Sequence, residues 1–228
     1  ARARQLIEET ISLDPRYAHA YMYMGTTHIQ DFLAGVGKSP KESLAQGIEW
    51  MQKALAIDDS LAEAHARLGH LYTFVNRHEE AIAEAEKAMA MDPNSAAVHY
   101  MACLVLRFSG KPAESIPAGK KSIRLEPFAP GIYYGNLGMA YFTNGTDCEE
   151  AIKAVEKGLE RTPDGMIVHF MATTVYSWCG KEKEARKTAK ELLRISPKFS
   201  ADSFAKRLPQ IHQKDKDRIT EALHKAGL

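Results

Sequence analysis

Histidine is the residue type in this chain that could most readily bind a metal ion or transfer a proton. The sequence contains nine histidines, and three of them, His65, His99 and His169, occupy equivalent places in segments of similar pattern. Metal binding requires nitrogens that converge to within about 2.1 Å of one ion. Side chains related by a repeat lie about one repeat apart, so these three cannot converge. We therefore predict a packing role for these histidines and no metal site.

The three cysteines, Cys103, Cys148 and Cys179, could form disulfides, bind a metal or act as nucleophiles. Their number is odd, and no two of them have the Cys-x-x-Cys spacing that is typical of redox and zinc motifs. Isolated cysteines on helices are most often small buried apolar residues. The sequence therefore predicts three structural thiols, a reducing setting and a cytoplasmic location.

Motifs that hold a phosphate or an activated nucleophile are missing from the sequence. It has no Gly-x-Gly-x-x-Gly or Walker-type loop and no nucleophile elbow. Residues 135–138 fall inside an expected helix, where glycine permits close packing, and residues 144–146 are typical of a turn. We predict no catalytic residue, no cofactor and no enzymatic activity in this chain. Any such activity would lie in a domain upstream of it.

The composition points to a folded protein without a preference for a charged partner. Charged residues make up 26% of the 228 residues, and 30 basic side chains oppose 29 acidic ones. A net charge of +1 gives no reason to expect nucleic acid or an anionic membrane as the partner. No apolar run approaches the roughly 18 residues that a membrane-spanning helix needs.

Short helix-ending signals recur along the chain at a nearly constant interval. Asp59 to Pro93, Pro93 to Pro127 and Pro163 to Pro197 each span 34 residues, since 93 − 59, 127 − 93 and 197 − 163 all equal 34. A period of 34 residues is that of the tetratricopeptide (TPR) repeat, in which each unit is a pair of helices. An unrelated helical bundle would not hold this register three times. No segment alternates in polarity as a strand does.

Within each period the residue types recur as well. Gly69 and Gly138 each follow a leucine and precede a tyrosine by three residues, at places where two helices must approach closely. The second helix of a unit carries small residues at spacings of four and then three, as in Ala81, Ala85 and Ala88. These spacings keep the small side chains on one face, where neighbouring helices can interlock.

The predicted fold is all-α, a right-handed superhelix of TPR helix pairs over residues 1–197 with C-terminal capping helices over 198–228. The chain opens directly in a second helix, so we expect it to be a fragment of a longer protein. Ile219 and Leu223 are four residues apart in the tail and would cover the last repeat. The predicted helix-pair units are 1–15 (partial), 16–59, 60–93, 94–127, 128–163 and 164–197.

Local signals refine these boundaries. Ten extra residues lengthen the first full pair, with a loop expected at 35–38 and a new helix starting at Ser39 with a capping-box pattern. Ser95 and Asp147 are predicted to cap the helices that follow them. Pro117 lies about one turn inside a second helix, where we expect a bend rather than a break.

Residues 16–197 resemble the TPR superfamily throughout, and the tail carries a narrower likeness. It looks like the C-terminus of bacterial class III adenylate/guanylate cyclases, in which a TPR stack follows the catalytic domain. The resemblance implies a regulatory or interaction region of a bacterial signalling protein, and it transfers no catalytic residue, because no segment here supplies the cyclase sheet. The residues that carry the likeness are Phe199, Ser200, Ser203–Pro209, Asp217, Arg218 and Lys225–Leu228.

The remaining candidate site is the inner face of the superhelix, which the first helices line at fixed offsets from Leu68 and its equivalents. The residues at these offsets are mainly aromatic and aliphatic, and Arg107 is the main cation among them. The lysine and asparagine cluster by which some TPR grooves hold a terminal carboxylate is missing. The predicted groove residues are His19, Met22, Gln30, His70, Phe74, Tyr100, Leu104, Arg107, Phe108, Ile132, Met139, Phe142, Ile167, Phe170 and Trp178.

These residues predict a protein-interaction scaffold whose groove takes an amphipathic helix or an apolar peptide, with aromatic side chains as anchors. The ligand could be another protein or the chain's own upstream domain. The same residues could instead be buried by the chain itself. Two further functions fit the same pattern, a homo-oligomeric assembly scaffold and the TPR region of a winged-helix transcriptional regulator, and the sequence does not decide between them.

Overall fold

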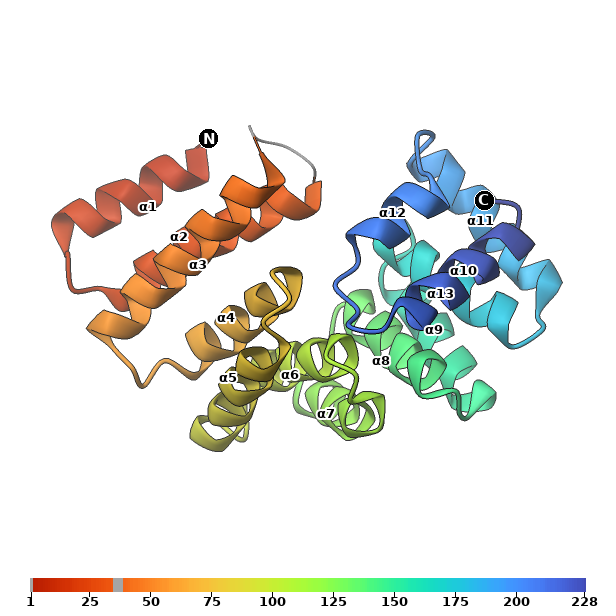
Figure 1. Cartoon of the computed structure of the whole chain (residues 1–228), viewed down its shortest axis with the longest axis horizontal. Coiled ribbons are helices and arrows are strands. Elements are labelled where there is room, and N and C mark those ends of the chain that lie inside the picture. The colour runs from red at the N-terminus through yellow and green to blue at the C-terminus, as the bar shows by residue number, and fades with distance from the viewer. Residues whose placement is uncertain (1, 35–38) are drawn as a thin grey trace. The chain divides into compact units, whose positions relative to one another are not determined.

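The computed structural model describes residues 2–34 and 39–228, so the loop expected at 35–38 lies outside the described residues. Over the described part of the chain there are 13 α-helices and no strand (Figure 1). The all-α prediction is confirmed. The helices are α1 (Arg2–Leu13), α2 (Ala18–Ala34), α3 (Pro40–Ile57), α4 (Ala62–Phe74), α5 (His78–Met91), α6 (Ala96–Phe108), α7 (Pro112–Leu125), α8 (Gly131–Asn144), α9 (Cys148–Arg161), α10 (Met166–Trp178), α11 (Glu182–Ile195), α12 (Ala201–Arg207) and α13 (Gln213–Lys225).

Consecutive helices pack in pairs, as the 34-residue period predicts. The pairs are α2 with α3, α4 with α5, α6 with α7, α8 with α9, and α10 with α11. By its internal contacts the chain forms two compact units, which we call unit 1 (Ala1–Pro93) and unit 2 (Asn94–Leu228). The tail, 198–228, packs within unit 2 and does not form a unit of its own.

The recurring spacing of glycine and alanine within each period has a direct steric cause. A Cβ atom on Gly69 would lie 2.8 Å from the carbonyl oxygen of Ala81, and one on Gly138 would lie 2.6 Å from the side chain of Val155. Both distances are too short for a real side chain, so the first and second helices can approach this closely only at glycine. Ala81 and Ala85 on the facing helix are fully buried. This confirms the predicted close-packing role.

Unit 1 contains the lengthened pair. Helices α2 and α3 have 17 and 18 residues, against 13 and 14 in α4 and α5. Helix α3 begins as predicted, with Ser39 at the N-cap and proline at the first position, but the Ser39 side chain makes no capping hydrogen bond. The capping-box prediction is therefore wrong in this detail. The Ser43 amide instead donates to the main-chain carbonyl of Ser39 at 3.0 Å.

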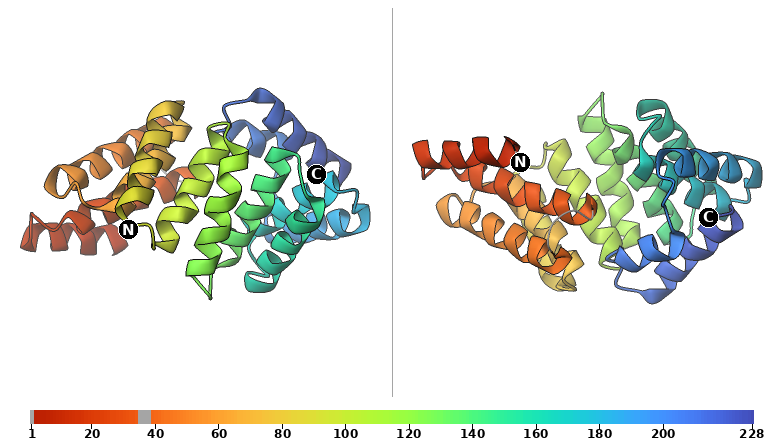
Figure 2. Two further views of the ribbon diagram at one scale, coloured as in Figure 1. Left: turned by 90° about the horizontal axis from the view of Figure 1, so that it is seen from below. Right: turned by 90° about the horizontal axis from the view of Figure 1, so that it is seen from above.

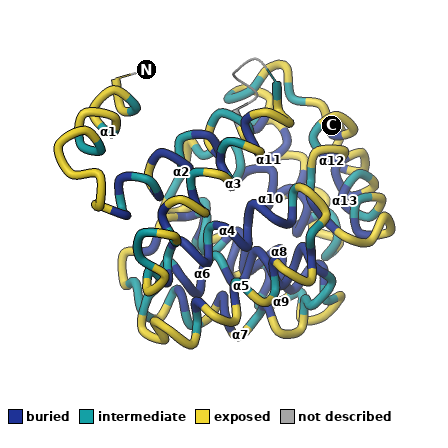
Figure 3. The backbone as a smooth tube through the Cα atoms, turned by 60° about the vertical axis from the view of Figure 1, so that its left-hand side comes forward, coloured by how far each residue is buried: buried dark blue, intermediate teal, exposed yellow. Residues whose placement is uncertain are grey.

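Helix α1 is held in unit 1 mainly by polar contacts. None of its residues is buried, and its tube carries only the colours of exposed and intermediate residues (Figure 3). The Arg4 guanidinium donates to the Thr27 hydroxyl at 2.7 Å and to the Asp31 carboxylate at 2.8 Å, which joins α1 to α2. Helix α1 thus buries little apolar surface.

Two helices of unit 2 begin with the predicted side-chain caps. The Ser95 hydroxyl accepts a hydrogen bond from the Val98 amide at 3.2 Å, and the Asp147 carboxylate accepts one from the Glu150 amide at 3.1 Å. Each bond satisfies a main-chain donor that the first turn leaves without an intrahelical acceptor. Helix α7 continues through Pro117 from Pro112 to Leu125, so the helix is not broken there.

The prediction of three isolated thiols is wrong for two of the cysteines. Cys148 and Cys179 form a disulfide with a Cα–Cα distance of 5.6 Å. Cys148 begins α9 and Cys179 follows α10, so stacking of successive pairs brings together residues that are 31 positions apart. Cys103 remains a free buried thiol, and burial raises its pKa. No described helix is both long enough and apolar enough to cross a membrane.

Candidate functional site

The predicted groove residues of unit 1 lie on α2 and α4, and they differ in accessibility. On α2, Met22 is fully buried, Gln30 is exposed, and the partly exposed ring of His19 stacks on Tyr17 with 5.5 Å between the centroids. These α2 side chains do not form one continuous apolar surface, because Gln30 interrupts it with an amide.

An aromatic group on α4 continues this face of unit 1. His70 is buried, and the ring of Phe74 packs edge-on against it at 5.2 Å and against Phe32 of α2 at 4.9 Å. Phe74 itself is only partly buried. Edge-to-face packing of this kind fixes the rings in one arrangement. Unit 1 therefore brings together His70 and Phe74, two of the predicted anchors.

In unit 2, the groove residues of α6 form a small buried cluster. Tyr100, Leu104 and Phe108 are each less than 9% exposed and pack together with Tyr133 and the partly buried Ile132. The rings of Tyr100 and Tyr133 stack at a centroid distance of 4.0 Å, nearly parallel. These aromatic groups are thus already engaged with one another.

Arg107, the predicted main cation of the groove, is buried rather than presented to solvent. Its guanidinium is 3% exposed, donates through Nη2 to the Asn136 side-chain oxygen at 3.1 Å, and lies 4.2 Å from the ring centroid of Phe108. Its Nε has no hydrogen-bond acceptor. Burial lowers the pKa of Arg107 to about 10, so the group stays charged at neutral pH. The expectation of an accessible cation is therefore wrong.

The predicted residues of α8 and α10 form the most apolar part of this face. Met139, Phe142 and Phe170 are almost fully buried, and the ring of Trp178 meets that of Phe142 edge-on at 5.6 Å. Ile132 and Ile167 are partly buried against the same cluster.

The tail lies on this part of unit 2. Helix α13 packs against α10, and Figure 2 shows the dark blue tail beside the preceding helices of unit 2. Ile219 and Leu223 are fully buried in the cluster that contains Phe142 and Phe170, and the ring of Phe204 packs against Phe170 at 4.6 Å. The predicted groove residues of α8 and α10 are therefore covered by an amphipathic helix of the same chain.

A basic residue of α13 anchors this contact. The Arg218 guanidinium donates to the carbonyl oxygens of Phe142 at 2.8 Å and Thr143 at 3.3 Å, in the last turn of α8. It also lies 4.6 Å from the centroid of the Phe142 ring. A cation at a helix C-terminus satisfies free carbonyls and opposes the negative end of the helix dipole. Arg218 is not among the predicted site residues, because its position in the sequence does not show which carbonyls it meets.

The segment between α12 and α13 extends the contact to α6. The Ile211 amide donates to the Phe108 carbonyl oxygen at 2.9 Å, and Gln210 is buried beside it in the chain. The sequence predicted that the tail covers the last repeat, and the tail in fact makes further contacts. It touches the first helix of each of the three pairs in unit 2.

The repeated histidines have the local packing role that their positions predicted. The His65 ring pairs with the Asp59 carbonyl at 3.1 Å and with the Glu84 carboxylate at 2.5 Å. The His169 ring pairs with the Pro163 carbonyl at 2.7 Å. In both cases the histidine is bonded to the carbonyl six residues earlier, in the turn that precedes its helix. Among the described residues, no group of three or more His, Cys, Asp or Glu side chains could hold a metal ion.

Comparison with known proteins agrees with this architecture. Residues 62–95 match the family model of the tetratricopeptide repeat. No curated protein sequence matches the chain significantly. The family model thus identifies one tetratricopeptide repeat, and solved structures share the chain's fold over most of its length.

Three solved structures illustrate the likeness. PilW, a type IV pilus biogenesis factor, is 15% identical with a TM-score of 0.66, covering 92% of this chain and 90% of that one. PilF from Pseudomonas aeruginosa is 20% identical with a TM-score of 0.64, covering 90% and 88%. YrrB, a TPR protein with an unusual peptide-binding site, is 20% identical with a TM-score of 0.53, covering 89% and 98%. At these identities the likeness concerns the fold.

Proposed function

We propose that this protein is an interaction scaffold that binds an amphipathic helix or an apolar peptide on the inner faces of its first helices. One observation carries the proposal. The predicted groove residue Phe142 contacts Arg218 of an amphipathic helix, α13, and shares a buried cluster with Ile219 and Leu223 of that helix, which is the kind of ligand that the groove is predicted to take. In unit 1 the same offsets carry Met22, His70 and Phe74.

The proposed signalling role rests on the sequence alone. The likeness of residues 199–228 to the tail of class III cyclases supports a regulatory region of a bacterial signalling protein. The expectation of a cytoplasmic location depends on three unpaired cysteines, and the Cys148–Cys179 disulfide removes that reason. Disulfides persist mainly in oxidising compartments. The location therefore stays a prediction.

A peptide-display selection on the full chain tests the proposed function. We expect it to return amphipathic or apolar peptides, and we expect Phe74→Glu to weaken their binding by roughly 30-fold, the effect of losing a hot-spot aromatic. Met91→Glu is the matched control, because Met91 is an exposed apolar residue at the end of a second helix. Phe108 is less suitable, since it is 5% exposed and its replacement would disturb folding.

Two outcomes would contradict the proposal. Either no peptide is selected above background, or the selected peptides bind Phe74→Glu and Met91→Glu equally well. Circular dichroism of both variants must show the helix content of the parent chain. Mass measurement in solution tests the competing idea of a homo-oligomeric scaffold, for which a defined multimer is expected at micromolar concentration.

A further inference from the structure

The tail of unit 2 has the properties of a bound ligand rather than of a permanent structural cap. We infer that α13 is a releasable occupant of the inner face of α8 and α10, and that the partner is an amphipathic helix which competes with it. The inference rests on the proposed function and specifies the ligand chemistry. The competing helix carries a cation immediately before the first member of an aliphatic pair spaced four residues apart, as Arg218, Ile219 and Leu223 do.

The contacts of α13 define this chemistry. Ile219 and Leu223 are both fully buried and lie one turn apart on the same side of α13, so they enter the apolar cluster together. Arg218 reaches in the direction of the last turn of α8 and donates to two main-chain carbonyls. Charge-assisted bonds to carbonyls at a helix C-terminus favour a cation and give the contact a fixed register. A neutral residue in place of Arg218 would retain the apolar contact but lose that register.

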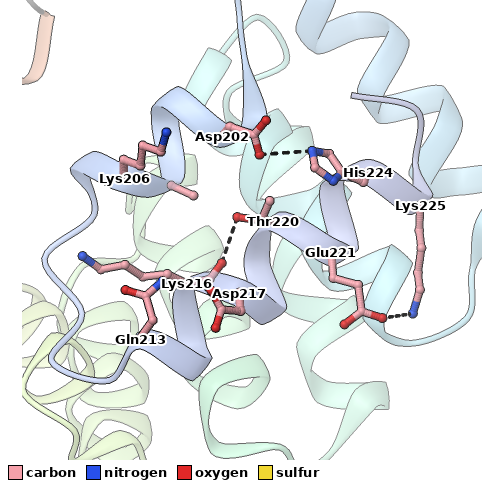
Figure 4. Close-up of a pocket in the computed structure, with 10 residues that line it drawn as sticks. Asp202, Lys206, Gln213, Lys216, Asp217, Thr220, Glu221, His224 and Lys225 are labelled. Carbon is pink, nitrogen blue, oxygen red and sulfur yellow. Dashed lines mark hydrogen bonds and ion pairs between the residues drawn. The ribbon is translucent and has the colours of Figure 1, made fainter.

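The other contacts of α13 are largely polar and exposed. Helix α13 buries four residues, Asp215, Ile219, Ala222 and Leu223, as many as each of the second helices α5, α7, α9 and α11. Its side toward α12 borders a cleft of about 650 Å³ that is lined mainly by charged and polar residues, including the aliphatic parts of their side chains (Figure 4). The ion pair across that cleft joins Asp202 and His224 at 3.3 Å, and both side chains are more than half exposed. Exposed pairs of this kind hold two helices together only slightly.

The segment that connects α12 to α13 contains a buried amide side chain that the fold does not satisfy. Gln210 is 4% exposed, and neither its amide nitrogen nor its amide oxygen has a hydrogen-bond partner. Asp215, 5% exposed, is 3.6 Å from the Arg218 guanidinium. An unpaired buried amide opposes docking, because water would satisfy it after release. Residues 208–212 are not helical and can act as the hinge.

A competition experiment on the full chain tests the inference. The probe is a fluorescent synthetic peptide of residues 213–228, the sequence of α13 and the last residues of the chain. When a site is occupied intramolecularly, its apparent affinity for a free ligand is the intrinsic affinity multiplied by the fraction of molecules in which the site is open. Arg218→Ala in the chain weakens the intramolecular competitor, so we expect it to bind the peptide about tenfold more tightly than the parent chain. Lys214→Ala, which removes an exposed cation from the same helix, is the control and should bind like the parent.

The inference would be overturned if the peptide bound neither chain, or bound the parent and Arg218→Ala equally. A peptide carrying Arg218→Ala and Leu223→Ala must not bind. Hydrogen exchange provides a second readout in the parent chain: added peptide should accelerate exchange of the chain's own α13 amides while α8–α11 stay protected. Loss of protection in α8–α11 of Arg218→Ala would reveal an unfolded variant, and the parent-chain exchange then decides the question alone.

The two proposals can fail separately. The probe is the chain's own helix, so its result does not depend on finding an external partner. If α13 is a fixed cap, peptides selected on the full chain can still bind in a manner that depends on Phe74. If no external peptide binds, competition by the α13 peptide can still be measured.

Discussion

The two ends of the chain finish in helices that are used in opposite ways. Helix α1 of unit 1 buries none of its residues and is joined to α2 by hydrogen bonds from Arg4. Helix α13 of unit 2 buries Ile219 and Leu223 among the predicted groove residues and is anchored by Arg218. Both helices are amphipathic and polar on average. The difference is that α13 packs its apolar side against α10, whereas α1, unlike the second helices α5, α7, α9 and α11, buries no residue.

This difference shows that residues at the predicted groove positions become core residues where another helix lies on them. In unit 2, Phe142 and Phe170 have become core residues because the tail covers them. In unit 1 the corresponding face retains a partly exposed aromatic, Phe74, and an exposed amide, Gln30. Residue type at the predicted groove offsets therefore does not by itself fix how accessible these side chains are, since the tail covers those of α8 and α10 in unit 2.

The largest expected effect comes from truncating Phe142, the side chain against which the tail residue Arg218 packs. Phe142→Ala should destabilise unit 2 by about 3–5 kcal/mol, because it leaves a cavity beside Trp178 and removes the ring beneath Arg218. Leu71→Ala, at a fully buried position of unit 1, should cost about 2–5 kcal/mol. Only Phe142→Ala should release α13, as measured by hydrogen exchange in a denaturant series. Unchanged protection of α13 in Phe142→Ala would remove the distinction between the two positions.

The disulfide provides the next largest difference between the units. It closes a segment with a sequence separation of 31 residues, all of it within unit 2. Loop-closure entropy then predicts that reduction lowers the stability of unit 2 by about 3–4 kcal/mol. Unit 1 contains no cysteine, so its stability should not respond to reductant. Denaturant unfolding followed by hydrogen exchange, with and without reductant, measures both effects. The double variant Cys148→Ala and Cys179→Ala is the control and should not respond to reductant at all.

Much of the fold could be predicted because the determining signals are local and repeated. The 34-residue period sets the helix pairs, and Gly69 and Gly138 mark their crossings, where a Cβ atom would collide with the facing helix. The caps at Ser95 and Asp147 each depend on a side chain and an amide three residues later. Such short-range contacts leave a clear trace in the sequence.

The site was less predictable because its contacts join segments that are far apart in the sequence. The spacing of Ile219 and Leu223 predicts an apolar face but does not say which helices that face meets. Arg218 bonds to main-chain carbonyls about 75 residues away, and carbonyls have no residue-specific signal. Cys148 and Cys179 likewise meet only through the stacking of helix pairs. Burial of Arg107 follows from the same long-range packing.

The smallest expected effect concerns how second helices begin in the two units. Asp147 starts α9 with a side-chain cap and a left-handed backbone, φ 57°, whereas its equivalent Arg77 starts α5 with no side-chain cap and φ −93°. Asp147→Ala should therefore cost about 1–2 kcal/mol, since it loses the cap and places a Cβ in a strained conformation. Asp147→Asn should be nearly neutral, because asparagine can cap and tolerates this backbone. Asp147→Gly should fall between them, since glycine relieves the strain but provides no acceptor. Arg77→Ala should change the stability of unit 1 by only about 1 kcal/mol, because the exposed pair with Glu80 and the contact with the Tyr72 ring are each weak. Thermal unfolding of the four variants gives the order, and a glycine variant less stable than the alanine variant would contradict the left-handed start of α9.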